Sequence, residues 1–136
     1  MSFAKDILAG PAELGLPSKY LMFNGVIYLA GGALLLAWPG LVQTLLRDRA
    51  FVGQEEGLFR VIGVALMIVG WLCTMGGRTG SREMVAATVP DRVVFVPVVL
   101  GWLAMSGVFP RFMIAIAILD PVMGIGAWVL LRRSAA

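Results

Sequence analysis

Asp120 lies near the middle of an otherwise apolar run, FMIAIAILDPVMGIGAWVLL, at residues 112–131. An aspartate at the centre of a membrane helix costs about 2.5–3.5 kcal/mol on insertion scales, so it normally faces protein and takes a polar partner. Ala117, Asp120, Gly124 and Ala127 follow at intervals of three, four and three residues, which places them on one stripe of a helix. Small residues on such a stripe let a neighbouring helix approach closely. We therefore expect Asp120 to face the protein interior, where it binds a ligand, handles a proton or only fixes helix register.

The proline that follows Asp120 adds a second polar atom at the same depth. Pro121 has no N–H group, so the carbonyl of Ala117 loses its usual helical donor. This carbonyl lies on the same stripe as the carboxyl group of Asp120. The sequence thus predicts a small polar site inside an apolar helix.

Two residues of the first apolar run are candidate partners for Asp120. Asn24 and Tyr28 are four residues apart and share a helix face with Gly31. Tyr28 falls near the centre of its run, close to the depth predicted for Asp120, and its hydroxyl can donate a hydrogen bond. Asn24 and Tyr28 therefore either join Asp120 in a ligand site or serve helix packing alone, and the sequence leaves both roles open.

Arg60, the third residue of the second run, is the remaining candidate for this site. One hypothesis is that its long side chain bends inward and pairs with Asp120. The alternative is that it extends outward to the membrane surface. Glu56, one turn earlier, is a competing partner for the guanidinium group.

The chain lacks the residues of most catalytic and metal centres. It contains no histidine and a single cysteine, Cys73. Histidine is the commonest metal ligand and general base, and a lone cysteine cannot form an intramolecular disulfide. We therefore predict no catalytic residue, no metal site and no cofactor. This composition argues against independent redox or hydrolytic catalysis, although it does not exclude an enzyme.

The elements that position these residues are apolar helices. Hydrophobic residues make up 60% of the chain and the mean hydropathy is +0.91, which is too apolar for a water-soluble globule. A membrane-spanning helix needs roughly 20 residues. Four runs approach that length, so we predict an all-α, integral membrane four-helix bundle that forms a single domain over residues 1–136, with spans at 20–38, 58–75, 93–109 and 112–131.

The third run has an uncertain beginning. Residues 84–89 are also apolar, but Pro90 and the pair Asp91-Arg92 interrupt the pattern before Val93. We predict a start at Val93 and leave an earlier start open.

The segment between the first two runs predicts a short fifth helix. Leu41, Val42, Leu45 and Leu46 fall on one side of a helix, with polar residues largely opposite. Such a helix lies on the bilayer surface. The alternative is an amphipathic linker that packs on the end of the bundle.

The basic residues predict how the chain is oriented. The net charge of +3 comes from residues at the edges of the runs, which indicates membrane anchoring rather than nucleic-acid binding. If the spans alternate, seven basic residues lie on one side and four on the other. The positive-inside rule then places both termini in the cytoplasm. The seven are Lys5, Lys19, Arg78, Arg82, Arg92, Arg132 and Arg133.

The order of these features resembles a known group. A glycine-rich first helix, the segment EEGLFRVIGVALMIVGW, a DR pair before a proline-containing third helix and the closing LDPVMGIGAWVLLRR look like the DoxX-like and BphX-like small bacterial membrane proteins. The resemblance covers roughly Tyr20 to Arg133. It implies a four-helix bundle in the bacterial inner membrane, with Arg60 and Asp120 as shared polar positions. Some members are linked to membrane oxidoreductase complexes and to sulfur or quinone chemistry, and the group has no agreed catalytic residues.

Two classes of function follow from these observations. In the first, the protein is a non-catalytic subunit or assembly factor of a larger membrane complex, with other membrane subunits or further copies of itself as partners. In the second, the bundle encloses a pocket that binds or transports a lipid-like or quinone-like molecule through Asp120, Tyr28, Asn24 and Arg60. We expect the first. A sealed core around Asp120 would favour the subunit, and a lipid-accessible pore that leads to Asp120 would favour the binder.

Overall fold

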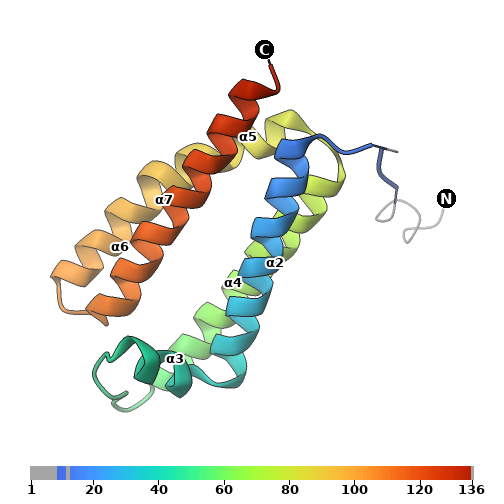
Figure 1. Ribbon diagram of the computed structural model, residues 1–136. Helices are drawn as coiled ribbons and strands as arrows, with labels where there is room; N and C mark the ends of the chain where they lie inside the picture. The colour runs from blue at the N-terminus through green and yellow to red at the C-terminus, as the bar shows by residue number, and fades with distance from the viewer. Residues whose placement is uncertain (1–8, 12, 136) are drawn as a thin grey trace.

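The computed structural model describes residues 9–11 and 13–135, and all regular structure in that part of the chain is helical (Figure 1). The elements, in order, are α2 (Leu16–Ala37), α3 (Pro39–Leu46), α4 (Glu55–Arg78), α5 (Arg82–Pro90), the π-helical turn η1 (Asp91–Phe95), α6 (Val96–Met105) and α7 (Pro110–Arg133).

Four helical segments are long and apolar enough to cross a membrane: α2, α4, the continuous α5–η1–α6 and α7. Each exposes large apolar side chains to its surroundings, for example Phe23, Ile68, Val98 and Ile118. A surface of this kind is stable against lipid rather than water. The predicted all-α bundle of four membrane helices is confirmed, and so is the short helix between the first two spans.

The third span begins at Arg82, ahead of the predicted start at Val93, and ends at Met105 rather than Phe109. Pro90 does not break it, because a proline removes only one helical hydrogen bond and neighbouring helices hold the segment in place. The helix instead widens into a π turn, in which the Val96 N–H donates to the carbonyl of Asp91.

This longer span changes the place of Arg92. Arg92 was expected among the loop charges, but its side chain is buried within the span. Lys5, counted on the same side, lies outside the described residues. With Arg92 removed from the predicted seven, six basic residues remain against four, so the charge difference keeps its direction and becomes smaller.

Helices α2 and α4 pack with their backbones in direct contact. Gly25 and Gly32 of α2 face Gly70 and Gly63 of α4, and Gly77 of α4 faces Ser18 and Met22. Within each helix these glycines are seven residues apart. A Cβ atom on Gly32 would lie 2.5 Å from the carbonyl oxygen of Gly63, and one on Gly70 would lie 2.6 Å from that of Gly25. Seven-residue spacing keeps small residues on one face of two slightly supercoiled helices. This contact packs α2 and α4 closely as a pair.

The segment after α3 ties the beginning of α7 to the rest of the bundle. Asp48 is buried, and its two carboxylate oxygens accept the backbone N–H groups of Arg111 at 3.1 Å and Phe112 at 2.7 Å. A carboxylate suits this position because the first N–H groups of a helix have no helical acceptor. The Arg111 guanidinium also donates to the carbonyl of Arg47 at 2.7 Å.

Helix α3 itself packs on the bundle. Val42 and Leu46 lie against a core cluster that includes Phe59, Phe109 and Phe112. Leu45 is 68% exposed and points away from this cluster. Val42 and Leu46 therefore pack on the end of the bundle, as an amphipathic linker would. Leu45 lies on the outer face of α3 instead.

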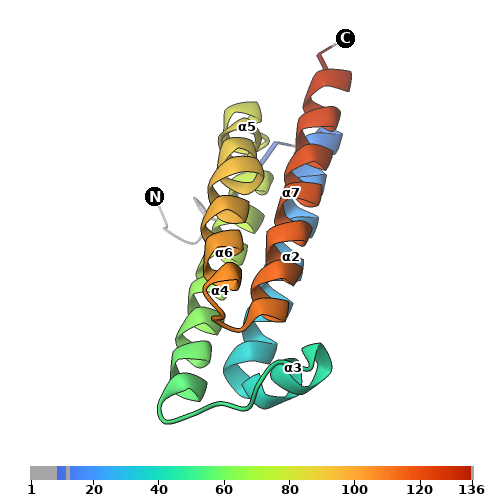
Figure 2. The same cartoon turned by 90° about the vertical axis from the view of Figure 1, so that its left-hand side faces the viewer.

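The opposite end of the bundle, where α2 begins and α7 ends, has contacts of its own (Figures 1 and 2). Arg82 of α5 donates to the carbonyl of Leu131 at 2.6 Å and to the hydroxyl of Ser134 at 2.9 Å. Below these bonds lies a buried cluster of Leu21, Cys73, Val85, Ala127 and Leu131. The α2–α4 pair and the α6–α7 pair are thus joined at both ends, and the site described next lies between these two joined regions.

Candidate functional site

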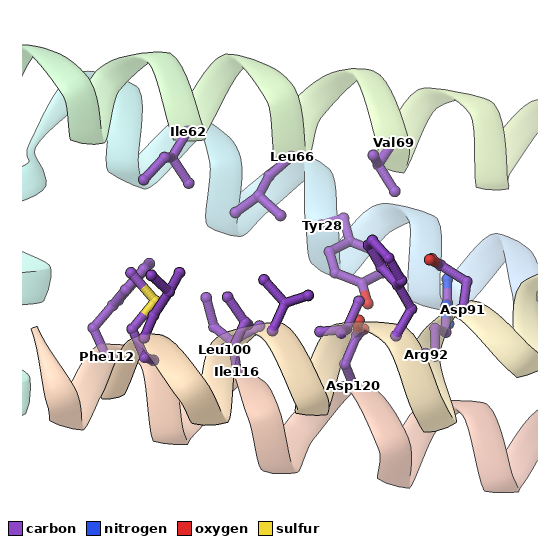
Figure 3. A pocket seen from close by; sticks show the side chains of 15 residues that line it. Tyr28, Ile62, Leu66, Val69, Asp91, Arg92, Leu100, Phe112, Ile116 and Asp120 are labelled. Atoms are coloured by element: carbon purple, nitrogen blue, oxygen red, sulfur yellow. The ribbon is translucent and has the colours of Figure 1, made fainter. Parts of the chain in front are cut away.

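A cavity of about 380 Å³ lies between the two helix pairs (Figure 3). All four membrane helices contribute to its wall, which is mostly apolar. Its polar lining residues are Tyr28, Asp91, Arg92 and Asp120. A largely apolar cavity with a few converging polar groups is the usual form of a site for a small amphipathic molecule.

A second cavity of about 210 Å³ lies on the α2 and α7 side of the same region. It is lined in part by Gly31 of α2, Val42 of α3 and Leu119 of α7. Five residues line both cavities: Tyr28, Leu66, Phe112, Ile116 and Asp120. Asp120 and Tyr28 therefore lie where the two cavities adjoin.

Asp120 is buried, as its position on the small-residue stripe predicts. A Cβ atom on Gly124 would lie 3.0 Å from the Cβ of Arg92, so the third span approaches α7 closely at this stripe. The Oδ1 atom of Asp120 has no hydrogen-bond partner in the described part of the chain. Asp120 thus faces protein, as expected, but among the described residues its Oδ1 atom lacks the protein partner that was expected for it.

Tyr28 lies at the depth predicted for it. Its ring lines both cavities, and in Figure 3 its hydroxyl points toward the carboxyl group of Asp120. Asn24, one turn earlier, is 1% exposed, and neither its Nδ2 nor its Oδ1 atom has a partner among the described residues. Asn24 lines neither cavity. The structure therefore brings Tyr28 to Asp120 and leaves Asn24 in the adjoining core.

Arg60 takes local partners. Its guanidinium donates to the backbone carbonyl of Leu36 and forms an ion pair with Glu56 at 2.9 Å. Carbonyl groups in the last turn of a helix have no helical donor, so Leu36, near the end of α2, offers Arg60 a ready acceptor. The hypothesis of an Arg60–Asp120 pair is wrong for this structure, and the competing pair with Glu56 is the one that forms.

Arg92 is the site residue that the sequence prediction missed. It is 3% exposed, and its guanidinium carbon lies 5.1 Å from the centre of the Tyr28 ring, a cation–π contact. Its Nη2 atom donates to the Cys73 sulfur at 3.3 Å, which is a weak acceptor. Its Nη1 atom has no partner within the described residues. The signal for Arg92 was the apolar stretch that begins before Pro90, which places the arginine inside the third span.

The chemistry available at this site is binding rather than metal chemistry. Within the described residues, no group of three or more His, Cys, Asp or Glu side chains could hold a metal ion. The site instead offers a guanidinium, a carboxyl group and a phenol next to an apolar volume. No protein-family model, curated protein or solved structure matches this chain.

Proposed function

We propose that this membrane protein binds a lipid-like or quinone-like small molecule in the cavity between its two helix pairs. The observation that carries the proposal is the cavity of about 380 Å³ that reaches the buried groups Tyr28, Arg92 and Asp120. Phe95 and Val99 line this cavity and are exposed, so the cavity opens to the lipid-facing surface and a molecule in the bilayer can enter it. Transport of the same molecule would use the same site.

The subunit or assembly-factor function remains a prediction. It rests on the resemblance to DoxX-like proteins, some of which are linked to membrane oxidoreductase complexes, and its partners would be other membrane subunits or a second copy of this chain. A cavity that reaches Asp120 supports the binder instead. The two functions are compatible if the protein delivers its ligand to such a complex.

Filling the cavity will weaken binding. Ile116 lines both cavities, so Ile116→Trp places a large side chain in the region that they share. We expect it to lower binding at least about tenfold, a loss of roughly 1.4 kcal/mol. The measurement is photolabelling of the protein in phosphatidylcholine nanodiscs with a diazirine-bearing fatty alcohol and, separately, a diazirine-bearing short-chain quinone, with labelled residues mapped by mass spectrometry.

Ile118→Trp is the matched control for this experiment. Ile118 is on the same helix, is 61% exposed and lines neither cavity. It should keep wild-type labelling of the cavity residues. If neither probe labels those residues in the wild-type protein, or if Ile116→Trp labels as well as Ile118→Trp, the proposed function is wrong.

We further propose that the protein lies in a bacterial inner membrane with both termini in the cytoplasm and α3 on the other side. The charge difference of the flanking residues supports this orientation. Val52, 69% exposed near α3, and Ala135, exposed after α7, are suitable positions for single cysteines. In intact cells an impermeant maleimide should label Val52→Cys at once and Ala135→Cys only after permeabilisation. The native Cys73 is buried and provides a low background, and the reverse labelling pattern would exclude the orientation.

A further inference from the structure

Arg92 and Asp120 line one cavity, and each carries a buried polar atom that has no partner in the described part of the chain. Arg92 Nη1 is a hydrogen-bond donor and Asp120 Oδ1 is an acceptor, and neither is paired within the described residues. Their side chains are only 3% and 5% exposed. Both residues lie inside membrane-spanning helices, where water does not satisfy groups that the protein leaves unpaired.

The two groups do not satisfy each other. No ion pair within 4.0 Å joins Arg92 to Asp120. The contacts with Cys73 and with the Tyr28 ring hold the guanidinium where it is. An unpaired polar group in a dry interior costs roughly 1–3 kcal/mol, and more when it is charged. A site that keeps one unpaired donor and one unpaired acceptor is complementary to a molecule that supplies both counterparts.

The polar and apolar parts of the cavity are separated along its length. Figure 3 shows Asp120, Tyr28, Arg92 and Asp91 toward one end, while Phe112 and Ile62 lie toward the other. A bound molecule that matches both ends has a polar head at Asp120 and Arg92 and an apolar tail that extends toward α3. The opposite charges of the two residues disfavour a charged head, because an anion would face Asp120 and a cation would face Arg92.

We propose that the ligand is a neutral amphiphile whose head carries a carbonyl-type acceptor for Arg92 beside an N–H or O–H donor for Asp120. This inference rests on the proposed function, since it names the class of molecule that the same cavity takes. Asp91, which is exposed and also lines the cavity, adds a second carboxylate that disfavours an anionic head.

Four probes with one oleoyl chain and different heads test the proposal. Oleamide offers an acceptor and a donor, methyl oleate an acceptor alone, oleylamine a cationic donor and oleate an anion. Each competes with the diazirine-bearing fatty alcohol in phosphatidylcholine nanodiscs. We expect oleamide to compete roughly tenfold better than methyl oleate, as one hydrogen bond to a charged group implies, and better than either charged probe.

Two variants test whether Asp120 and Arg92 cause the preference for oleamide. In Asp120→Ala the advantage of oleamide over methyl oleate should disappear, whereas in Arg92→Met both carbonyl probes should weaken by about tenfold. The ratio between probes is measured within each variant, so a change in the amount of folded protein does not affect it. Ile118→Trp should keep the wild-type ratio.

The outcomes separate this inference from the proposed function. If wild type is labelled in the cavity but all four probes compete equally, or oleate or oleylamine competes best, the head-group assignment is wrong and the proposed function stands. If Asp120→Ala keeps the full preference for oleamide, the assignment to Asp120 is wrong. If no cavity residue is labelled and no probe competes, the proposed function fails, and the head-group assignment fails with it.

Discussion

Gly32→Ala will destabilise the protein by about 2–3 kcal/mol, whereas Gly31→Ala, one residue earlier, will leave its stability unchanged or raise it by up to about 1 kcal/mol. A Cβ atom on Gly32 would lie 2.5 Å from the carbonyl oxygen of Gly63 and 2.8 Å from the backbone nitrogen of Met67. Backbone atoms cannot rotate away as a side chain can, so α2 and α4 must move apart. A Cβ atom on Gly31 has nothing within 4 Å and gains only helix propensity.

Thermal unfolding of the two variants in the same detergent measures this difference. The two variants have the same composition and differ only in what the added methyl group meets. A second pair on α4 gives an independent comparison, because Gly70→Ala meets the carbonyl of Gly25 while Gly57→Ala meets nothing within 4 Å. Equal melting temperatures for Gly31→Ala and Gly32→Ala would show that the helices do not pack through these glycines.

The glycine contact was visible in the sequence only as spacing. Gly25 and Gly32, and Gly63, Gly70 and Gly77, each recur every seven residues, but they stand among 17 glycines in the chain. Gly31 shares the helix face of Tyr28 by its spacing, and it lines the second cavity with Tyr28. Which glycine touches another helix depends on how the two helices are rotated, and no single helix pattern contains that information.

The sequence also predicted only part of the candidate site. Depth and the small-residue stripe on α7 were enough to place Asp120 in the interior. Depth alone placed Tyr28 at the level of Asp120, and both residues line the same cavities, because two spans of similar length bring their centres to one level. Depth misjudged Arg60, since the free carbonyl of Leu36 and the nearby Glu56 satisfy it locally. Arg92 was missed because Pro90 and Asp91 resembled the end of a loop, while the π turn carries the helix through them.

The two buried aspartates of the described chain differ in how well they are satisfied. Asp48 accepts two backbone N–H groups at the beginning of α7. Asp120 keeps one oxygen without a partner and lies beside a cavity. A residue that is costly to bury and is not compensated within the protein is typical of a binding site, where stability is lost for function.

Asp120→Leu will therefore stabilise the ligand-free protein by about 2 kcal/mol, and it will lower binding of the oleamide probe to the level of methyl oleate. The substitution removes an unpaired polar group from the membrane interior, and the adjoining cavity has room for the larger side chain. Asp48→Leu, the same change at the satisfied aspartate, should destabilise by about 2 kcal/mol, because the first N–H groups of α7 lose their acceptor. Melting temperatures in detergent without added amphiphile measure both. If Asp120→Leu instead melts as far below wild type as Asp48→Leu does, Asp120 has a structural partner. It then serves to fix helix register, the alternative role that the sequence allows.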